Sequence, residues 1–235
     1  MKVLYIRPKA GTNKLLYILV SLSLLFAFSA CSGDDDEDDA GTSSETTSLS
    51  TPSYNGYEYV DLGLSVKWAA CNVGASSIDD YGNYYAWGEY VTKSAYTAAS
   101  STTYNVEGME DISGSSRYDV ARIKMGGTWR IPTYEEMREL VKYCEWTWTG
   151  DYKHYGYLIT GDTGNSIFLP AGGIGAEEKN SYGNVGRGYY WTSTPGGSYD
   201  NHNKYAYSLE FSSYGYGIEK YWERYRGFLV RAVSE

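Results

Sequence analysis

Short stretches that alternate apolar and polar residues are the feature that most restricts how this chain can fold. Such a period of two is typical of β-strands with two different faces. The stretches are separated by turns rich in glycine, and the first two lie on either side of Gly63. They predict strands at residues 57–60, 65–69, 166–169, 189–192, 205–211 and 228–233.

The stretch 205–211 has the clearest alternation. Its large apolar residues are Tyr205, Tyr207, Leu209 and Phe211, and the residues between them are Ala206, Ser208 and Glu210. Because alternate side chains of a strand point to opposite faces, the pattern predicts a strand with one face on a core and the other in water.

One helix is strongly indicated after Pro132. Thr133 is a suitable N-cap, and Glu136 stands where its side chain can complete a capping box. An apolar stripe at helical spacing follows, formed by Met137, Leu140, Val141 and Cys144. We therefore expect an amphipathic helix that packs on a core.

A second, shorter helix is expected at 117–125, ended by the glycine pair 126–127. The two helices do not alternate with the strands, so the fold class is α+β with antiparallel sheets. Residues 54–235 are enough for one domain. The chain has 27 Tyr, 27 Gly and 7 Trp against 5 Phe, which favours short strands, many turns and aromatic loops.

The N-terminus has the order of a secretion signal. A basic stretch is followed by the uncharged run 15–28 and then by Phe28, Ser29, Ala30 and Cys31. As a helix this run would cover about 21 Å, less than the roughly 30 Å of a bilayer core. We therefore interpret residues 1–30 as a cleaved signal peptide.

The residues before Cys31 resemble a bacterial lipobox, although Phe28 stands where leucine is usual. The resemblance implies acyl chains on the Cys31 sulfur and on its new amino group, hence a membrane partner through a lipid anchor. The alternative is ordinary cleavage with Cys31 as a bystander.

Residues 31–53 are expected to be a disordered tether. Six consecutive acids at 34–39 repel one another, and 40–53 are mostly Ser, Thr and Gly. The acidic run also resembles the signal that sends some lipoproteins to the outer face of the outer membrane, so we expect a cell-surface location. The alternative is a solvated spacer.

Two further cysteines, Cys71 and Cys144, follow the anchor. In an oxidising compartment they could form a disulfide, and the alternative is two buried free thiols. The sequence leaves both open.

Motifs across 57–235 resemble the Fibrobacter succinogenes major paralogous domain family. The first is YVDLGLSVKWAACNVG at 59–74, and the others, in order, are YAWGE at 85–89, GGTWRIPT at 126–133, GNSIFLPA at 164–171, YWTST at 190–194 and GFLVR at 227–231. The resemblance implies a C-type-lectin-like fold with two helices and long loops. It also implies a surface lipoprotein of the kind found in Bacteroidetes.

The sequence does not indicate an enzyme. Distant relatives of the fold include an oxidase that uses a cysteine pair near its C-terminus, and no cysteine follows Cys144 here. His154 and His202 have no metal-ligand motif around them, and no G-x-S-x-G elbow occurs. No Lys/Arg cluster favours nucleic acid, and we expect no cofactor.

A binding function is indicated by the loops expected at 176–188, 195–204 and 212–226. Candidate aromatic contacts are Tyr182, Tyr199, Tyr214, Tyr216, Tyr221 and Trp222, and the candidate polar partners are Asp200, Asn201 and Asn203. The alternative is that these rings pack the core, as we expect for Trp129, Trp146, Trp148 and Trp191. The tripeptides of the familiar calcium-dependent sugar site are absent, so a sugar would have to bind at another site. Acidic and amide side chains are common in the loops, which leaves a structural calcium open with no ligands assigned.

Two functions follow from these observations. The first is a lipid-anchored surface protein whose domain binds an extracellular glycan or protein. The alternative is a structural or accessory component of a surface assembly that has no soluble ligand.

Overall fold

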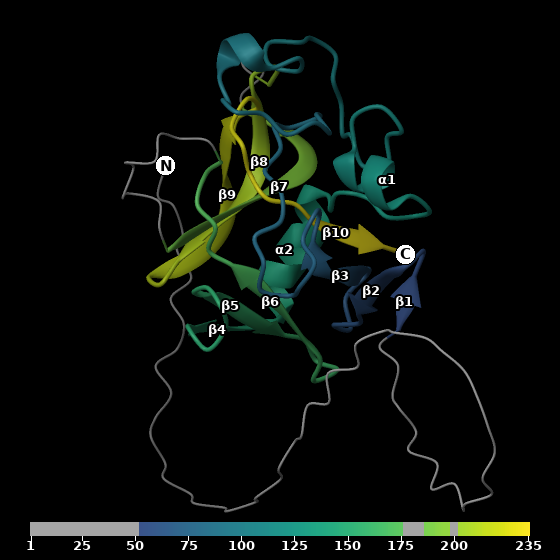
Figure 1. The fold of residues 1–235 in the computed structure, drawn as a ribbon, viewed down its shortest axis with the longest axis vertical. Coiled ribbons are helices and arrows are strands. Elements are labelled where there is room, and N and C mark those ends of the chain that lie inside the picture. Colours follow the sequence, from purple (N-terminus) through teal and green to yellow (C-terminus); the bar gives the residue numbers. More distant parts are fainter. Residues whose placement is uncertain (1–51, 176–185, 198–201) are drawn as a thin grey trace, which may run out of the picture. The chain divides into compact units, whose positions relative to one another are not determined.

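The computed structural model describes residues 52–175, 186–197 and 202–235, and every structural statement below concerns these residues (Figure 1). The predicted signal peptide at 1–30 and the tether at 31–53, except its last two residues, lie outside the described residues. Among the described residues, no helix has the length and apolar character needed to cross a membrane.

The described chain forms three antiparallel sheets and two α-helices, in agreement with the α+β class (Figure 1). The first sheet, in order, contains β1 (Ser53–Tyr54), β2 (Tyr57–Val60), β3 (Lys67–Asn72) and β10 (Arg231–Ser234). The second contains β4 (Glu145–Thr149), β5 (Gly156–Thr160) and β6 (Ser166–Pro170). The third contains β7 (Arg187–Gly196), β8 (Tyr205–Ser212) and β9 (Gly215–Glu223).

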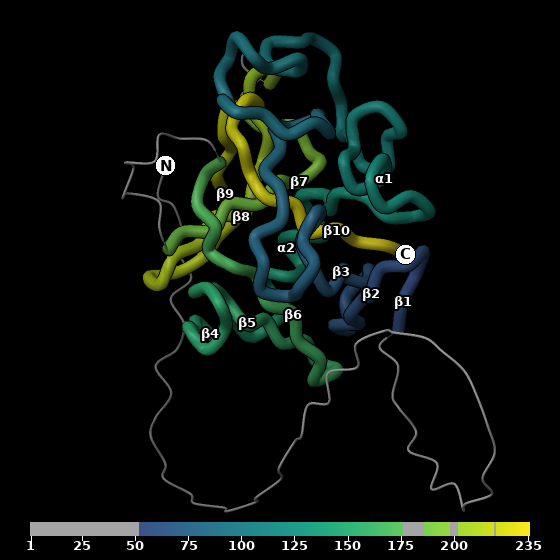
Figure 2. The backbone as a smooth tube through the Cα atoms, viewed as in Figure 1, coloured from purple at the N-terminus to yellow at the C-terminus, as the bar shows by residue number. Residues whose placement is uncertain are grey.

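The first sheet joins the two ends of the domain. Strand β10 pairs with β3, so residues near the C-terminus lie beside residues near position 70, as the backbone trace shows (Figure 2). This pairing connects the N-terminal and C-terminal parts of the domain. Residues of both strands also enter each of its two apolar clusters.

Helix α2 (Tyr134–Tyr143) confirms the predicted capping box. The Thr133 hydroxyl accepts a hydrogen bond from Glu136 N, and the Glu136 carboxylate accepts one from Thr133 N at 2.8 Å. The predicted stripe is buried, and Cys144 caps the helix at its end.

Helix α1 (Val120–Met125) is shorter than the predicted 117–125. Asp119 has an extended backbone and caps the helix, because its Oδ1 accepts hydrogen bonds from the amides of Ala121 and Arg122. The predicted end is confirmed, since Gly126 follows with a φ of 70°. A 3₁₀ turn, η1 (Ala98–Ser100), lies in the long connection before α1.

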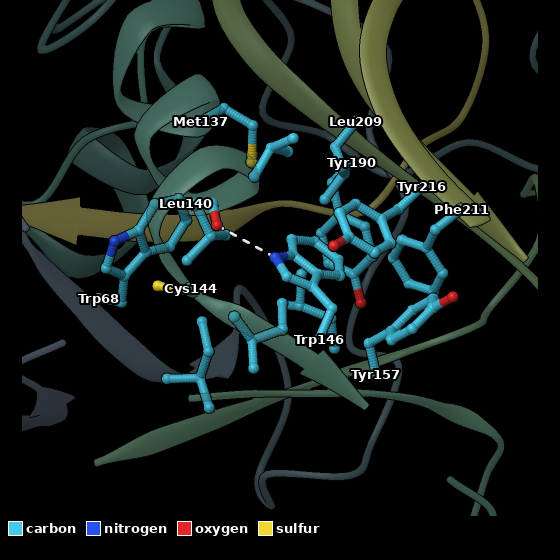
Figure 3. Close-up of a cluster of buried hydrophobic side chains, with 14 of the residues drawn as sticks. Trp68, Met137, Leu140, Cys144, Trp146, Tyr157, Tyr190, Leu209, Phe211 and Tyr216 are labelled. Atoms are coloured by element: carbon cyan, nitrogen blue, oxygen red, sulfur yellow. Dashed lines mark hydrogen bonds between the residues drawn. The ribbon is translucent and has the colours of Figure 1, made fainter. Parts of the chain in front are cut away.

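Two buried apolar clusters lie on the two faces of the third sheet. Tyr190 and Leu209 belong to the first cluster, which α2 and the second sheet complete (Figure 3). Trp191 and Ala206 belong to the second, with Trp87 from the preceding connection. Because neighbouring residues of one strand enter different clusters, this sheet is covered on both sides over most of its length.

The prediction that 205–211 has one face in water is therefore wrong. Ala206 and Ser208 are fully buried, and Glu210 is 4% exposed. The alternation itself is correct, but the second cluster covers the face that carries the small and polar residues. The buried Glu210 carboxylate is compensated by Lys220, at 2.8 Å, and by Arg187, at 3.6 Å.

The strands were predicted in part. Strands β1, β4, β5 and β9 were not predicted, and β9 occupies most of the expected loop 212–226. The stretch 228–233 is a regular strand only from Arg231, and before it Phe228 and Leu229 make isolated bridges to Tyr85 and Tyr190. Tertiary pairing, which alternation alone does not report, decides these differences.

Candidate functional site

Four of the predicted binding residues lie outside the described residues. They are Tyr182, Tyr199, Asp200 and Asn201. The other five lie in or beside the β8–β9 hairpin, and the structure separates them into different environments.

Two of the predicted binding residues, Tyr216 and Asn203, are internal, which corrects their assignment. Tyr216 is buried and its ring stacks on Trp146 at a centroid distance of 4.2 Å. Trp222 is partly buried, because its ring packs against Phe228 of the second cluster while its side chain also lines the shallow hollow described below. Asn203 is buried, with its amide nitrogen directed at Asn105 and Glu107. Residues 215–223 of the expected loop 212–226 form the paired strand β9, so alternate side chains of this part enter the core.

The other two predicted residues are exposed. Tyr214 is 85% exposed at the tip of the hairpin, and no described ring contacts it. Tyr221 is 45% exposed near the opposite end of β9, where it belongs to a group of aromatic side chains.

We call this group the tyrosine cluster, and it consists of Tyr134, Tyr205, Tyr207 and Tyr221. The ring of Tyr221 lies 5.3 Å from Tyr205 and 5.9 Å from Tyr207, in both cases edge to face. The ring of Tyr207 lies 4.7 Å from Tyr134, the first residue of α2. All four side chains are partly exposed. The structure thus brings together three residues that the sequence did not mark as a site.

Strand register explains where the tyrosine cluster lies. Tyr207 pairs with Tyr221 across β8 and β9, so their side chains share one face. Leu209 and Phe211 lie further along the same face, beneath α2 and the second sheet. Helix α2 covers this face of the sheet only as far as its first residue, Tyr134. The next tyrosines along β8 therefore lie at the surface.

Three hydroxyl groups of the tyrosine cluster are available for a ligand. Within the described part of the chain, the hydroxyls of Tyr205, Tyr207 and Tyr221 make no hydrogen bond. A shallow hollow of about 330 Å³ lies beside two of these rings, lined by Tyr205 and residues 220–223. The cluster therefore offers apolar ring surface together with hydrogen-bonding groups, the combination for which tyrosine is used at interfaces.

A second and larger hollow lies between β2 and β3, and we call it the β2–β3 groove. Its volume is about 930 Å³, within the range of small-molecule sites. Its walls include Tyr57, Ile78, Tyr90 and Val91, all of which are exposed, and its floor is formed by β3. No binding residue was predicted here, because these side chains come from three separate segments.

Both later cysteines are free thiols, and their positions explain why they are unpaired. Trp68 of β3 packs in the same cluster as Cys144 (Figure 3). Cys71 is three residues further along β3, so it projects from the opposite face and lines the β2–β3 groove. Burial raises the pKa of the Cys71 thiol, and it raises that of Cys144 to about 11.

The described residues assemble no set of three His, Cys, Asp or Glu side chains that could hold a metal ion. His154 stacks on Tyr81 at a centroid distance of 3.9 Å, and His202 presents its backbone carbonyl to Arg224. The buried Arg224 guanidinium also donates to the carbonyl of Tyr205 at 3.2 Å. The positively charged Arg224 guanidinium thus occupies the position that faces these backbone carbonyls.

The described residues thus form a domain of three antiparallel sheets and two α-helices, with a cluster of tyrosines at its surface. No family model matches the chain, and neither does any curated protein or solved structure.

Proposed function

We propose that this chain is a lipid-anchored cell-surface protein whose domain has a C-type-lectin-like fold and binds an extracellular glycan without catalysis. The lipobox-like residues before Cys31 and the acidic run after it support export and anchoring. The family-like motifs support the fold, and three antiparallel sheets with two helices are compatible with it.

The tyrosine cluster is the observation that carries this proposal. The apolar face of a sugar ring packs well on aromatic rings, and its hydroxyls need partners that water would otherwise provide. Tyr205, Tyr207 and Tyr221 supply both kinds of contact on a surface built from regular strands. A rigid support keeps the entropy cost of binding low.

The charges near the cluster favour a neutral ligand. The carboxylate of Glu223 lies 3.2 Å from Nε of Arg226, so it is already compensated. The cluster itself has no carboxylate pair, histidine or thiol, which are the groups that would be needed for hydrolysis.

The first experiment is a glycan array probed with the exported chain carrying Cys31→Ser, with and without EDTA. We expect binding that Tyr207→Ala and Tyr221→Ala each weaken by about tenfold, which corresponds to about 1.4 kcal/mol. Loss of binding in EDTA would add a calcium requirement.

The matched control is Tyr214→Ala. Tyr214 belongs to the same hairpin, but it lies at the far end, roughly 20 Å along the strand from Tyr207. A blank array, or binding that Tyr214→Ala weakens as much as Tyr207→Ala does, would overturn a glycan site at the cluster.

A further inference from the structure

The rings of the tyrosine cluster are inclined to one another. The planes of Tyr205 and Tyr221 form an angle of 67°, and those of Tyr207 and Tyr221 form an angle of 89°. The planes of Tyr134 and Tyr207 form an angle of 55°. Successive sugars of a polysaccharide chain stack on rings that face the same way, so none of these three pairs is a platform for two neighbouring sugars.

Strand β7 holds two members of the cluster in place. Its pairing with β8 is irregular at 191–195, and threonines of this segment contact the cluster. The Thr192 hydroxyl donates a hydrogen bond to the carbonyl of Tyr207 at 2.9 Å, and the Thr194 hydroxyl accepts one from the backbone nitrogen of Tyr134 at 3.0 Å. The backbones that carry Tyr134 and Tyr207 are therefore fixed to one segment of β7, and a ligand meets a preformed surface.

The hollow beside the cluster has room for one sugar ring. Its volume of about 330 Å³ is near the lower limit of the range for small-molecule sites, which is roughly 300 to 1,000 Å³. The aromatic residues Tyr205, Tyr221 and Trp222 line it, and Tyr221 is 45% exposed. An aromatic wall of this size packs against the apolar face of a single sugar.

Glu223 provides the hollow with a charged hydrogen-bond acceptor. Its side chain is partly exposed, and one of its carboxylate oxygens accepts a hydrogen bond from Nε of Arg226 at 3.2 Å. A carboxylate has roughly four lone-pair positions, so Glu223 can also accept hydrogen bonds from the hydroxyls of a sugar. Such bonds to an ionised acceptor are stronger than those between neutral groups.

The charges around the hollow favour a neutral sugar. Lys220 also lines it, and the Lys220 ammonium lies 2.8 Å from the carboxylate of the buried Glu210. Glu223 is compensated by Arg226. Because both charges have partners within the protein, a sugar without a carboxylate or sulfate group leaves no charge uncompensated.

We propose that the tyrosine cluster binds one neutral sugar residue at the end or at a branch of a glycan, and not successive residues of an extended polysaccharide. This inference rests on the proposed function and narrows its class of ligand. The apolar face of the sugar packs on Tyr205 and Tyr221, and its hydroxyls donate to Glu223. A terminal or branch residue presents its whole ring to the hollow, whereas a residue inside a linear chain is flanked on both sides.

The test compares single sugars with chains of the same sugar by isothermal titration calorimetry. The protein is the exported chain with Cys31→Ser. The probes are the methyl glycosides of glucose, galactose, mannose and N-acetylglucosamine, and the corresponding linear oligosaccharides from dimer to hexamer. For the sugar that binds, we expect the Kd of the glycoside and that of the hexamer to agree within about threefold.

Three variants assign the binding to the hollow. We expect Tyr221→Ala and Glu223→Gln each to weaken glycoside binding by about tenfold. Glu145→Gln is the matched control, since Glu145 is an exposed carboxylate of β4 that does not line the hollow. All three variants should keep the parent melting temperature, because the replaced side chains are exposed or partly exposed.

Each contrary result has a distinct meaning. An affinity that rises more than about tenfold from glycoside to hexamer would show that several sugars bind at once, which would overturn this inference and leave the glycan site standing. Glycoside binding that Tyr221→Ala and Glu223→Gln leave unchanged would place the sugar elsewhere and also overturn it. No binding by any probe would overturn the glycan proposal together with this inference.

Discussion

The Nε atom of Arg231 donates a hydrogen bond to Oδ1 of Asn72 at 2.9 Å, and the arginine is 0% exposed. Its other nitrogens donate to the carbonyls of Ala69 and Ala70 in β3 and of Phe168 in β6. An amide and three carbonyls, and no carboxylate, therefore stabilise this buried cation. One side chain links the first sheet to the second.

Replacing Arg231 should be strongly destabilising. Arg231→Leu leaves four buried acceptors without donors, and we expect a loss of about 3 to 5 kcal/mol in the free energy of unfolding measured with urea. The control is Arg138→Leu, which should change little, because the Arg138 guanidinium is exposed and pairs with the exposed Glu135. Equal losses for both variants would show that the Arg231 network is unimportant.

Stability should fall as the pH rises above 10. Burial raises the pKa of Tyr84 and of Tyr157 to about 12, whereas the unfolded chain titrates near 10. Between these values the unfolded state has already released protons that the folded state still holds, so rising pH favours unfolding.

Urea unfolding at a series of pH values tests this dependence. Tyr84→Phe and Tyr157→Phe should each make the loss above pH 10 shallower, because the titrating group is gone. Tyr214→Phe should leave the slope unchanged, since its ring is exposed. If Tyr84→Phe and Tyr157→Phe keep the slope of the parent protein, the buried tyrosines are not the source of the pH dependence.

Asp119 should contribute more to stability than an ordinary helix cap. Its Oδ1 accepts from the amides of Ala121 and Arg122, and its Oδ2 accepts from those of Gly114 and Ile131. We expect Asp119→Ala to cost about 2 to 4 kcal/mol, against about 1 kcal/mol for the N-cap variant Thr133→Ala. Thermal unfolding of the two variants makes the comparison, and a smaller loss for Asp119→Ala would contradict it.

The two later cysteines should both react as thiols after unfolding. In the exported chain with Cys31→Ser, we expect two equivalents with Ellman's reagent under denaturing conditions without reductant. In the folded protein Cys71 should react first, because it is half-buried at the β2–β3 groove, while Cys144 is buried and has a pKa of about 11. An unreduced, denatured sample with no reactive thiol would show that they form a disulfide.

Cys31→Ala should abolish fatty-acid labelling and release the protein from membranes. Several acyl chains bind a bilayer almost irreversibly, and Cys31 is the residue on which we propose that they are carried. The measurement is radiolabelled palmitate incorporation together with membrane fractionation. Cys71→Ala is the control and should keep both label and membrane binding.

Local interactions explain the elements that were predicted correctly. The capping box of Thr133 and Glu136, the stripe beginning at Met137 and the glycine end of α1 each depend on residues within two helical turns. The alternation in β8 likewise reports which side chains share a face. These features are encoded where they occur, so periodicity and caps are sufficient to find them.

The sites depended on contacts between distant parts of the chain. Tyr207 is exposed because α2 begins at Tyr134, and Tyr216 is buried because β9 pairs with β8. The β2–β3 groove is lined by side chains that are distant in the sequence, among them Tyr57, Val91 and Lys124. The same tyrosine can be core or surface according to what covers its strand, so composition could not separate the two cases.

The sequence alone determined that antiparallel strands are combined with two helices, the positions of the caps and several of the strands, because each follows from neighbouring residues. Only the tertiary structure decided which face of each strand meets solvent and which aromatic rings are available to a ligand. It also decided that Cys71 and Cys144 lie on opposite sides of β3. Burial is a property of the assembled layers, whereas alternation records only that two faces differ.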